Sequence, residues 1–311
     1  MRIVLLGGAG FIGYHLSKLL SKNAEVIVIS RRLPSSKDRL DGVSYQQGDC
    51  GSSEVLKQVI RPGDYVVFLA YSSVPKTSFD DPLLDIQENL PLAINLLTVL
   101  REVPIQRLLY VSSGGTVYGH TGSMCPLSED HPTNPISPYG ITKLSIEKYC
   151  QMYCRIFGVP VVIARPSNPF GPQQIPFRGQ GFVATAVAKI LLREEISIFG
   201  ENGTIRDYLY IDDLASAMAL LLRANVAVGS IYNIGASVGM NNVEVLTSIA
   251  EVMGLAFSDL HINYLPIRGF DANYNVLATD KLKELGWHPS VGFRVGLSRT
   301  VEWQTASMNK V

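Results

Sequence analysis

The 311-residue chain has little cysteine and no surplus of charge of either sign. Its cysteines, Cys50, Cys125, Cys150 and Cys154, are too sparse for a disulfide framework. Lys plus Arg number 27 and Asp plus Glu number 27, so the chain lacks the basic surplus that neutralises nucleic-acid phosphates. We therefore expect reduced thiols, a cytoplasmic location and no nucleic-acid partner.

Long apolar runs are also missing, although 47% of the residues are hydrophobic. No window approaches 18 uninterrupted apolar residues, and the run at residues 3–6 ends at once in Gly7-Gly8-Ala9-Gly10, unlike a signal peptide. We predict neither a membrane span nor a membrane partner. With only 17% charged residues, the composition favours a folded chain with a hydrophobic core over a disordered one.

Strand-like and helix-like segments alternate through the first half of the chain. Short β-branched runs, typical of buried parallel strands, lie at residues 3–6, 25–30, 65–69, 107–111 and 160–164. Helical periodicity separates them, most clearly at residues 11–20, 85–100 and 137–157. This rhythm predicts an α/β fold with a doubly wound parallel sheet of the Rossmann type.

The pattern loosens after residue 166, where prolines and glycines interrupt it. A strand at residues 231–234 and a helix at residues 242–253 are the clearest later signals. We predict that residues 1–166 form a dinucleotide-binding domain. Residues 167–311 are expected to form mainly a smaller substrate-binding lobe, with part of 207–236 returning to the first domain.

Gly7, Gly10 and Gly13 lie between the first predicted strand and the first predicted helix. In that place glycines let the backbone approach a pyrophosphate, and the helix N-terminus supplies amide donors. The sequence therefore predicts a dinucleotide site here, with Phe11 and Ile12 beside the glycines.

The end of the second predicted strand bears on which dinucleotide binds. An acidic residue there accepts from the ribose 2′-hydroxyl of NAD, whereas Arg accommodates the 2′-phosphate of NADP. The chain has Ser30, Arg31 and Arg32, which favours NADP; NAD held by the backbone and Ser30 is the alternative. Further on, Asp49 precedes Cys50 and either accepts from the adenine amino group or caps a turn.

Tyr139 and Lys143 are four residues apart at the start of a predicted helix, so they share one face. An ammonium group near a phenol stabilises the phenolate and lowers the phenol's pKa. The tyrosine can then act as a general base on a substrate hydroxyl while hydride leaves the same carbon. The pair therefore predicts hydride-transfer chemistry.

Several segments together resemble the extended short-chain dehydrogenases/reductases. They are GGAGFIG at residues 7–13, SSGGTVYG at 112–119, Tyr139-x-x-x-Lys143, RDY at 206–208 and LGWHP at 285–289. Among these enzymes the chain most resembles nucleotide-sugar 4-epimerases of the UDP-glucose type. The resemblance implies C4 epimerisation of a UDP-hexose or UDP-N-acetylhexosamine through a 4-ketose, with the cofactor retained.

The resemblance also implies further contacts. The cofactor would touch Leu69, Ala70 and Pro166, and Asn89 would support its pocket. Asn168 would contact the nucleotide diphosphate of the substrate.

Three more residues would bind the nucleotide. Arg206 and Arg268 would clamp its phosphates, or else form surface ion pairs. Asp271 would hold its ribose, or else cap a turn. Asn275 would face the sugar's C2 substituent and admit an N-acetyl group, unless the register shifts to Tyr274.

The chain departs from the family pattern at Gly114, where a catalytic Ser or Thr normally stands. Ser113 or Thr116 would supply the hydroxyl instead, with Thr116 preferred. A 4,6-dehydratase needs an Asp-Glu pair directly after that position, and Gly115 and Thr116 stand there. The sequence thus disfavours dehydration.

Other readings stay open. An NADPH-dependent 4-ketoreductase would suit the two arginines after the second strand, and a non-enzymatic NADP-sensing protein would have no use for Tyr139 and Lys143. Cys150 and Cys154 lack partnering ligands, so no metal site is predicted. The resemblance implies a homodimer, for which helical stripes stand at Leu92, Leu96 and Leu97 and at Tyr149, Met152 and Tyr153.

Overall fold

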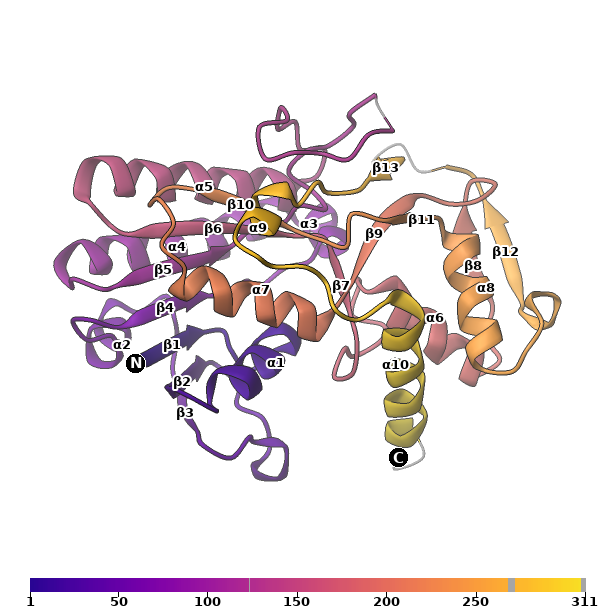
Figure 1. Ribbon diagram of the computed structural model, residues 1–311, viewed down its shortest axis with the longest axis horizontal. Helices are drawn as coiled ribbons and strands as arrows, with labels where there is room; N and C mark the ends of the chain where they lie inside the picture. Colours follow the sequence, from indigo (N-terminus) through magenta and orange to yellow (C-terminus); the bar gives the residue numbers. More distant parts are fainter. Residues whose placement is uncertain (123, 268–271, 309–311) are drawn as a thin grey trace. The chain divides into compact units, whose positions relative to one another are not determined.

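The computed structural model describes residues 1–122, 124–267 and 272–308, and the chain divides into two compact units (Figure 1). The first comprises Met1–Ser113, Ser137–Arg165 and Ala215–Tyr232; the second comprises Gly114–Ile136, Pro166–Leu214 and Asn233–Val311. This division differs from the predicted one, which left residues 114–136 in the first domain. The segment belongs to the second unit because the Leu127 amide donates to the Val276 carbonyl at 2.8 Å. These residues are far apart in the sequence, so a local sequence pattern does not predict the contact.

Within the described residues, seven strands of the first unit form a sheet in the order β10-β6-β5-β4-β1-β2-β3. Their bounds are β1 (Arg2–Leu6), β2 (Glu25–Ser30), β3 (Val43–Gln47), β4 (Tyr65–Phe68), β5 (Arg107–Val111), β6 (Val161–Pro166) and β10 (Ile231–Ile234). From β3 to β6 every neighbouring pair is parallel. This order is that of a doubly wound dinucleotide-binding fold, as the alternating periodicity predicted.

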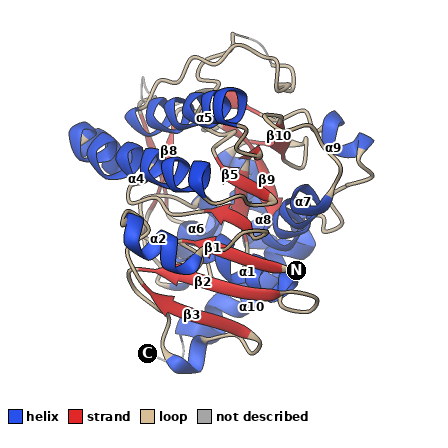
Figure 2. Ribbon diagram, turned by 90° about the vertical axis from the view of Figure 1, so that its left-hand side faces the viewer, coloured by secondary structure: helices blue, strands red, loops and turns tan. Residues whose placement is uncertain are grey.

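Helices cover both faces of this sheet (Figure 2). They are α1 (Phe11–Leu20), α2 (Ser53–Val59), α3 (Pro75–Asp80), α4 (Pro82–Glu102), α5 (Pro138–Phe157) and α7 (Ile211–Arg223), with a 3₁₀ turn, η1, at Ser36–Asp38. Alternate strand residues such as Val4 and Ile27 pack with α2, α4 and α5 in one core. The core therefore fixes the two long helices α4 and α5 against the sheet.

Local capping explains where α4 and α5 begin and end. The Asp81 carboxylate accepts from the amide of Leu84 at 2.9 Å, and the Ser137 hydroxyl accepts from the amide of Gly140 at 3.1 Å. Proline follows each cap, where its missing N–H is harmless. Gly158 ends α5 in the left-handed region, at φ 70°. Consequently α4 starts at Pro82, ahead of the predicted residue 85.

By length and composition alone, α4 is apolar enough to cross a membrane. Core helices of globular domains pass the same test, and α4 buries Ala93, Leu96 and Leu97 within the unit. We therefore read α4 as a core helix, while the cytoplasmic location stays a prediction.

The second unit has shorter strands and a different core. Strands β11 (Gly239–Met240), β9 (Ile205–Tyr210) and β13 (Tyr274–Asn275) form one sheet, with β7 (Asn168–Phe170) paired to β9. Strands β8 (Ile196–Phe199) and β12 (Ile262–Leu265) pair separately. The remaining elements are α6 (Phe182–Leu191), α8 (Asn242–Val252), η2 (Phe257–Asp259), α9 (Asp280–Glu284) and α10 (Phe293–Met308). This unit is the smaller mixed region that the broken periodicity predicted.

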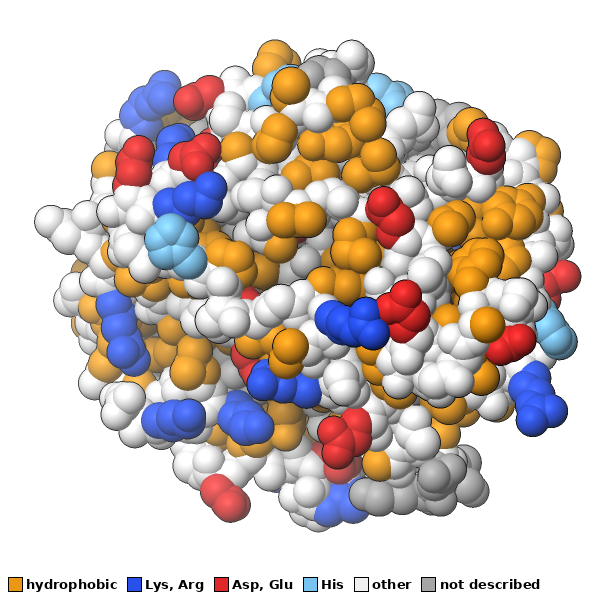
Figure 3. Space-filling model, turned by 45° about the vertical axis from the view of Figure 1, so that its right-hand side comes forward, with side chains coloured by type: hydrophobic (Ala, Val, Ile, Leu, Met, Phe, Trp, Pro, Cys, Tyr) orange, Lys and Arg blue, Asp and Glu red, His pale blue; other side chains and the backbone are white. Residues whose placement is uncertain are grey.

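Acidic, basic and apolar side chains all occur on the face shown in Figure 3. That mixture agrees with the equal numbers of acidic and basic residues, 27 of each, in the whole sequence.

Candidate active site

The loop between β1 and α1 borders a cavity of about 1160 Å³ in the first unit. A Cβ on Gly7 would lie 2.5 Å from the Ala70 backbone, and one on Gly13 would lie 2.2 Å from the Gly8 carbonyl. Gly10 differs, because the nearest atom to its added Cβ is 3.9 Å away. Gly10 also stands at the N-terminus of α1, so its missing side chain leaves room for a phosphate at the helix amides. The loop fits a dinucleotide.

Most of the predicted cofactor residues line this cavity: Gly7, Gly10, Ser30, Arg31, Arg32, Asp49, Cys50, Leu69 and Ala70. Its described lining does not include Phe11, Ile12, Gly13, Asn89, Tyr139, Lys143 or Pro166. It does include Tyr71, Ser72 and Glu88, which sequence reasoning missed. Gly13 lies close against the Gly8 backbone, and its role toward the cofactor stays a prediction.

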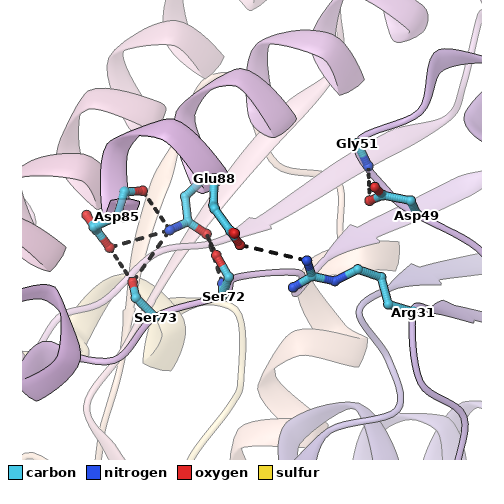
Figure 4. A network of polar contacts seen from close by, with 8 residues as sticks. Arg31, Asp49, Gly51, Ser72, Ser73, Asp85 and Glu88 are labelled. Carbon is cyan, nitrogen blue, oxygen red and sulfur yellow. Dashed lines mark hydrogen bonds and ion pairs between the residues drawn. The ribbon is translucent and has the colours of Figure 1, made fainter. Parts of the chain in front are cut away.

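Two of the predicted polar contacts have partners within the protein (Figure 4). The Arg31 guanidinium lies 3.7 Å from the Glu88 carboxylate, an ion pair that joins β2 to α4. The Asp49 carboxylate accepts from the amide of Gly51 at 2.9 Å, which is the turn-capping alternative. Burial raises the pKa of the Cys50 thiol to about 11, so this thiol is not a nucleophile.

Asn89 does not line the cavity itself but hydrogen-bonds to Ser72, which does. Its side-chain oxygen accepts from the amide of Ser72 at 2.9 Å and from the Ser72 hydroxyl at 3.0 Å. Its amide nitrogen donates to the backbone carbonyl of Asp85 at 2.8 Å. Asn89 therefore braces the segment after β4 that lines the cavity.

Tyr139 and Lys143 lie in the first turns of α5, where Tyr139 is half-buried and Lys143 is buried. The Lys143 ammonium donates to the Val111 carbonyl at 2.9 Å and lies 5.6 Å from the centroid of the Tyr139 ring. The Tyr139 amide donates to the Ser78 hydroxyl at 3.1 Å, which ties α5 to α3. The predicted pair thus shares one face and one environment.

The electrostatics of the pair differ from the expectation. Burial lowers the pKa of Lys143 to about 7, against the opposing effects of Asp85 and Glu147. Burial and the nearby Asp85 carboxylate raise the pKa of Tyr139 above its ordinary value. The expected lowering of the Tyr139 pKa is therefore absent, because desolvation outweighs the attraction of an ammonium group at this separation.

A buried ion pair fixes α5 behind these residues. Glu147 accepts from Nε of Arg165 at 2.9 Å and from its Nη2 at 2.6 Å, and the Ser112 hydroxyl also donates to Glu147. Both side chains of the ion pair are almost wholly buried. The bidentate contact joins α5 to β6, and Ser112 joins it to the end of β5.

The hydroxyl candidates have different surroundings. The Thr116 hydroxyl oxygen is buried and has no hydrogen-bond partner among the described residues. Ser113 is half-buried. Gly114 is held in place by two bonds: its amide donates to the Pro166 carbonyl at 2.8 Å, and its carbonyl accepts from the Asn275 side chain at 3.0 Å.

Asn275 is wholly buried, and its amide oxygen has no partner in the described chain. Its predicted role toward the C2 substituent of the sugar stays a prediction. Its observed contact is with the Gly114 backbone.

The substrate-binding candidates of the second unit lie on neighbouring strands. Asn168 on β7 donates to the Asp207 carbonyl at 3.1 Å, and Arg206 on β9 donates to the Ala272 carbonyl at 2.6 Å. Arg268 and Asp271 lie outside the described residues. The structure thus brings Asn168 and Arg206 to one sheet.

Asp207 is a buried acid that the sequence did not single out beyond its motif. Its carboxylate accepts from the amides of Ala236 at 2.8 Å, Ser237 at 3.1 Å and Leu277 at 3.2 Å. Burial raises its pKa to about 6 even so. Asp207 is a structural link between three segments, and its partners are too distant in sequence to be foreseen.

Metal chemistry has no candidate in the described part of the chain, which holds no group of three or more His, Cys, Asp or Glu residues suited to a metal ion. Cys150 is buried, and burial raises its pKa, as expected for a packed thiol.

The strand order and the cavity after β1 define a dinucleotide-binding enzyme, and the Tyr-Lys pair on α5 places it among the extended short-chain dehydrogenases/reductases. The profile of the NAD dependent epimerase/dehydratase family matches residues 3–235, and the chain belongs to this family.

Similar proteins include both kinds of enzyme in the family's name. The UDP-glucose 4-epimerase of Thermotoga maritima, solved with UDP-glucose, is 30% identical; the match has a TM-score of 0.91 and covers 99% of this chain and 100% of that one. The Thermus thermophilus UDP-glucose 4-epimerase, in complex with NAD, is 32% identical with a TM-score of 0.90, over 99% and 100%. A probable dTDP-glucose 4,6-dehydratase of Sinorhizobium fredii is 30% identical, over 97% of this chain and 92% of that protein.

Proposed function

We propose that the protein interconverts the C4 epimers of a nucleotide-diphosphate sugar, of the UDP-hexose or UDP-N-acetylhexosamine class, through a 4-ketose. The observation that carries this proposal is that the chain has the catalytic base but lacks the Asp-Glu pair that a 4,6-dehydratase needs to eliminate water. Half-buried Tyr139 and buried Lys143 lie together on α5, whereas residues 114–118 after β5 contain no carboxylate. Hydride transfer at C4 is therefore supported, and loss of water is not.

The side chains divide the work of the reaction. When bound, the dinucleotide supplies the acceptor and donor of the C4 hydride. Tyr139 takes the proton of the C4 hydroxyl as that carbon becomes a ketone, and returns a proton after the ketose has turned. Lys143 stabilises the negative charge that Tyr139 carries before it takes this proton and again after it has returned one. Asn168 and Arg206 bind the diphosphate together with Arg268, and Asp271 holds the ribose, as expected from the family resemblance.

Thr116 is our candidate for the hydroxyl that donates to the reacting sugar oxygen. Its oxygen has no partner among the described residues, so a substrate can become that partner. Replacing Thr116 by Val removes the hydroxyl at nearly constant volume and is expected to lower turnover. The matched change Ser113→Ala is expected to have the smaller effect, and the reverse order would move the role to Ser113.

For the cofactor we propose NAD, in place of the NADP that the arginines favoured. Arg31 lines the cavity, but Glu88 lies 3.7 Å from its guanidinium and neutralises it. A 2′-phosphate would meet the Glu88 carboxylate at the same place. The NAD found in the similar Thermus thermophilus enzyme supports this choice.

A homodimer remains part of the proposal, and Leu92, Tyr149, Met152 and Tyr153 of the predicted stripes are half-buried. Leu96 and Leu97 are buried in the unit's own core and are not available to a partner. Exposed apolar side chains of α4 and α5 lie instead at Leu83, Leu84, Ile86, Ile141, Ile156 and Phe157. Light scattering at micromolar concentrations is expected to give twice the monomer mass.

One assay separates the candidate reactions. The protein is incubated with UDP-glucose, UDP-N-acetylglucosamine and their C4 epimers, with NAD or NADPH, and the products are separated and weighed by mass spectrometry. Epimerisation gives a product of unchanged mass with no net consumption of cofactor. A product lighter by one water would overturn the proposal in favour of a dehydratase.

The second candidate function is an NADPH-dependent 4-ketoreductase, because Arg31 and Arg32 both line the cavity. In that case a 4-keto sugar nucleotide oxidises NADPH in equal amount, and the product is heavier by two hydrogens.

A further inference from the structure

Asp85, near the start of α4, is a buried carboxylate that the proposed reaction does not use. Only 1% of the residue is exposed. Its Oδ1 accepts from the Ser73 hydroxyl (Figure 4). It also accepts from the Tyr71 hydroxyl at 3.3 Å and from the Asn89 side chain at 3.4 Å. Its Oδ2 is buried with no hydrogen-bond partner in the described chain. A buried and partly unsatisfied charge is unfavourable unless a positive group nearby offsets it.

Tyr71 connects this carboxylate to the catalytic pair. The Lys143 ammonium lies 4.0 Å from the centroid of the Tyr71 ring, and the Tyr139 ring meets the same ring edge-on at a centroid distance of 5.0 Å. Tyr71 therefore touches both residues with its ring and Asp85 with its hydroxyl. The face of an aromatic ring attracts a cation, and a phenol that donates to a carboxylate attracts it more strongly.

We propose that Asp85, acting with Tyr71, is a positioning residue that holds Lys143 in its ammonium form beside Tyr139. The inference rests on the proposed function of Tyr139 and Lys143. An uncharged Lys143 could not stabilise a phenolate, so the charge state of this lysine decides whether the base can form.

The other groups around Lys143 do not supply this negative charge. They are Tyr139 and Glu147 on α5, Tyr110 on β5, and Arg165 on β6. Glu147 is held in a bidentate pair by Arg165, so its charge is already balanced. The Tyr110 ring lies farther from the ammonium group, at 5.5 Å. Asp85 is thus the nearby anion without a cationic partner of its own among the described ion pairs. Consistently, Asp85 is the larger of the two influences that raise the pKa of Lys143.

The test measures the titration midpoint of Lys143 by lysine-selective NMR. The Lys143 resonance is assigned as the one that disappears in Lys143→Met. In Asp85→Asn, which keeps the shape of the side chain, the midpoint is expected to fall by about one pH unit or more. Tyr71→Leu removes the ring and is expected to lower the midpoint as well. Glu102→Gln removes an exposed charge at the far end of the same helix and is expected to leave it unchanged.

Turnover gives a second readout. If Asp85 sets the charge of Lys143, the basic limb of the pH profile of kcat moves to lower pH in Asp85→Asn. A lower kcat with an unmoved profile and an unmoved Lys143 midpoint indicates a purely structural role and overturns the inference. The NMR titration needs no sugar, so a shifted midpoint in a protein that epimerises nothing would overturn the proposed function alone.

Discussion

The two units of the chain hold their functional side chains by different means. In the first unit the Tyr-Lys pair lies on a long helix that packs on a continuous parallel sheet, and the nearby polar groups are close in the fold because adjacent strands end at one edge. In the second unit Arg206 lies on β9 and Asn168 on the three-residue strand β7 beside it, and the Asp207 carboxylate joins β9 to other segments. The first unit combines hydrophobic periodicity with buried polar contacts of α4 and α5, whereas in the second unit one carboxylate links segments that are distant in sequence.

The largest expected effect is on kcat, and it tests whether Tyr139 of the first unit is the catalytic base. Tyr139→Phe removes only the phenolic oxygen and is expected to reduce kcat by ~10²–10⁴-fold, the usual contribution of a positioned base. Binding of NAD and of the sugar nucleotide, measured by titration calorimetry, is expected to stay within a few-fold. Turnover near the wild-type value would break the assignment.

The next effect concerns the buried ion pair between Glu147 and Arg165 in the first unit. Glu147→Gln leaves the Arg165 guanidinium buried without its counter-charge, and the expected loss is about 3–5 kcal/mol in the free energy of unfolding by urea. The double change Glu147→Leu with Arg165→Met removes both charges and is expected to recover most of that loss. A small effect of the single change would mean that hydrophobic packing alone secures α5.

A smaller effect tests whether diphosphate recognition belongs to the second unit. Arg206→Met is expected to weaken sugar-nucleotide binding by about 10–100-fold, since a charged hydrogen bond contributes about 1.5–3 kcal/mol. NAD affinity is expected to remain unchanged. Lys283→Met, which removes an exposed charge that pairs with Asp280, serves as the control. Equal losses for NAD and the sugar nucleotide would contradict the division of roles.

The smallest effect concerns the Arg31–Glu88 pair. Glu88→Gln frees the guanidinium, and the ratio of NADP to NAD affinity is expected to rise a few-fold, in keeping with the weak energy of an exposed pair. The measurement is fluorescence titration with each dinucleotide. Since the pair is exposed, the difference should shrink at high salt. An unchanged ratio would show that Arg31 does not read the ribose.

The same contrast explains what the sequence could predict. The strands of the first unit are short runs of buried β-branched residues, and the Tyr-Lys spacing is local, so both were predictable from neighbouring residues. Asp85 was not, because an acid in the first turn of a helix ordinarily favours the helix dipole in solvent. Its burial comes from Tyr71 and Ser73, in a segment before the helix. Leu96 and Leu97 failed as partner-facing residues for a related reason: periodicity marks an apolar face without saying what covers it.

Asp207 has a consequence for the alignment of β9 in its sheet. Because side chains alternate along a strand, a slip of one residue would move Arg206 into the space that now holds the carboxylate. There the guanidinium would face the amides of Ala236, Ser237 and Leu277, all donors that need an acceptor. Gly235 adds a steric limit, since a Cβ there would lie 2.3 Å from the Asp207 carboxylate. The Asp207 side chain thus favours the observed alignment of β9 over one shifted by a single residue.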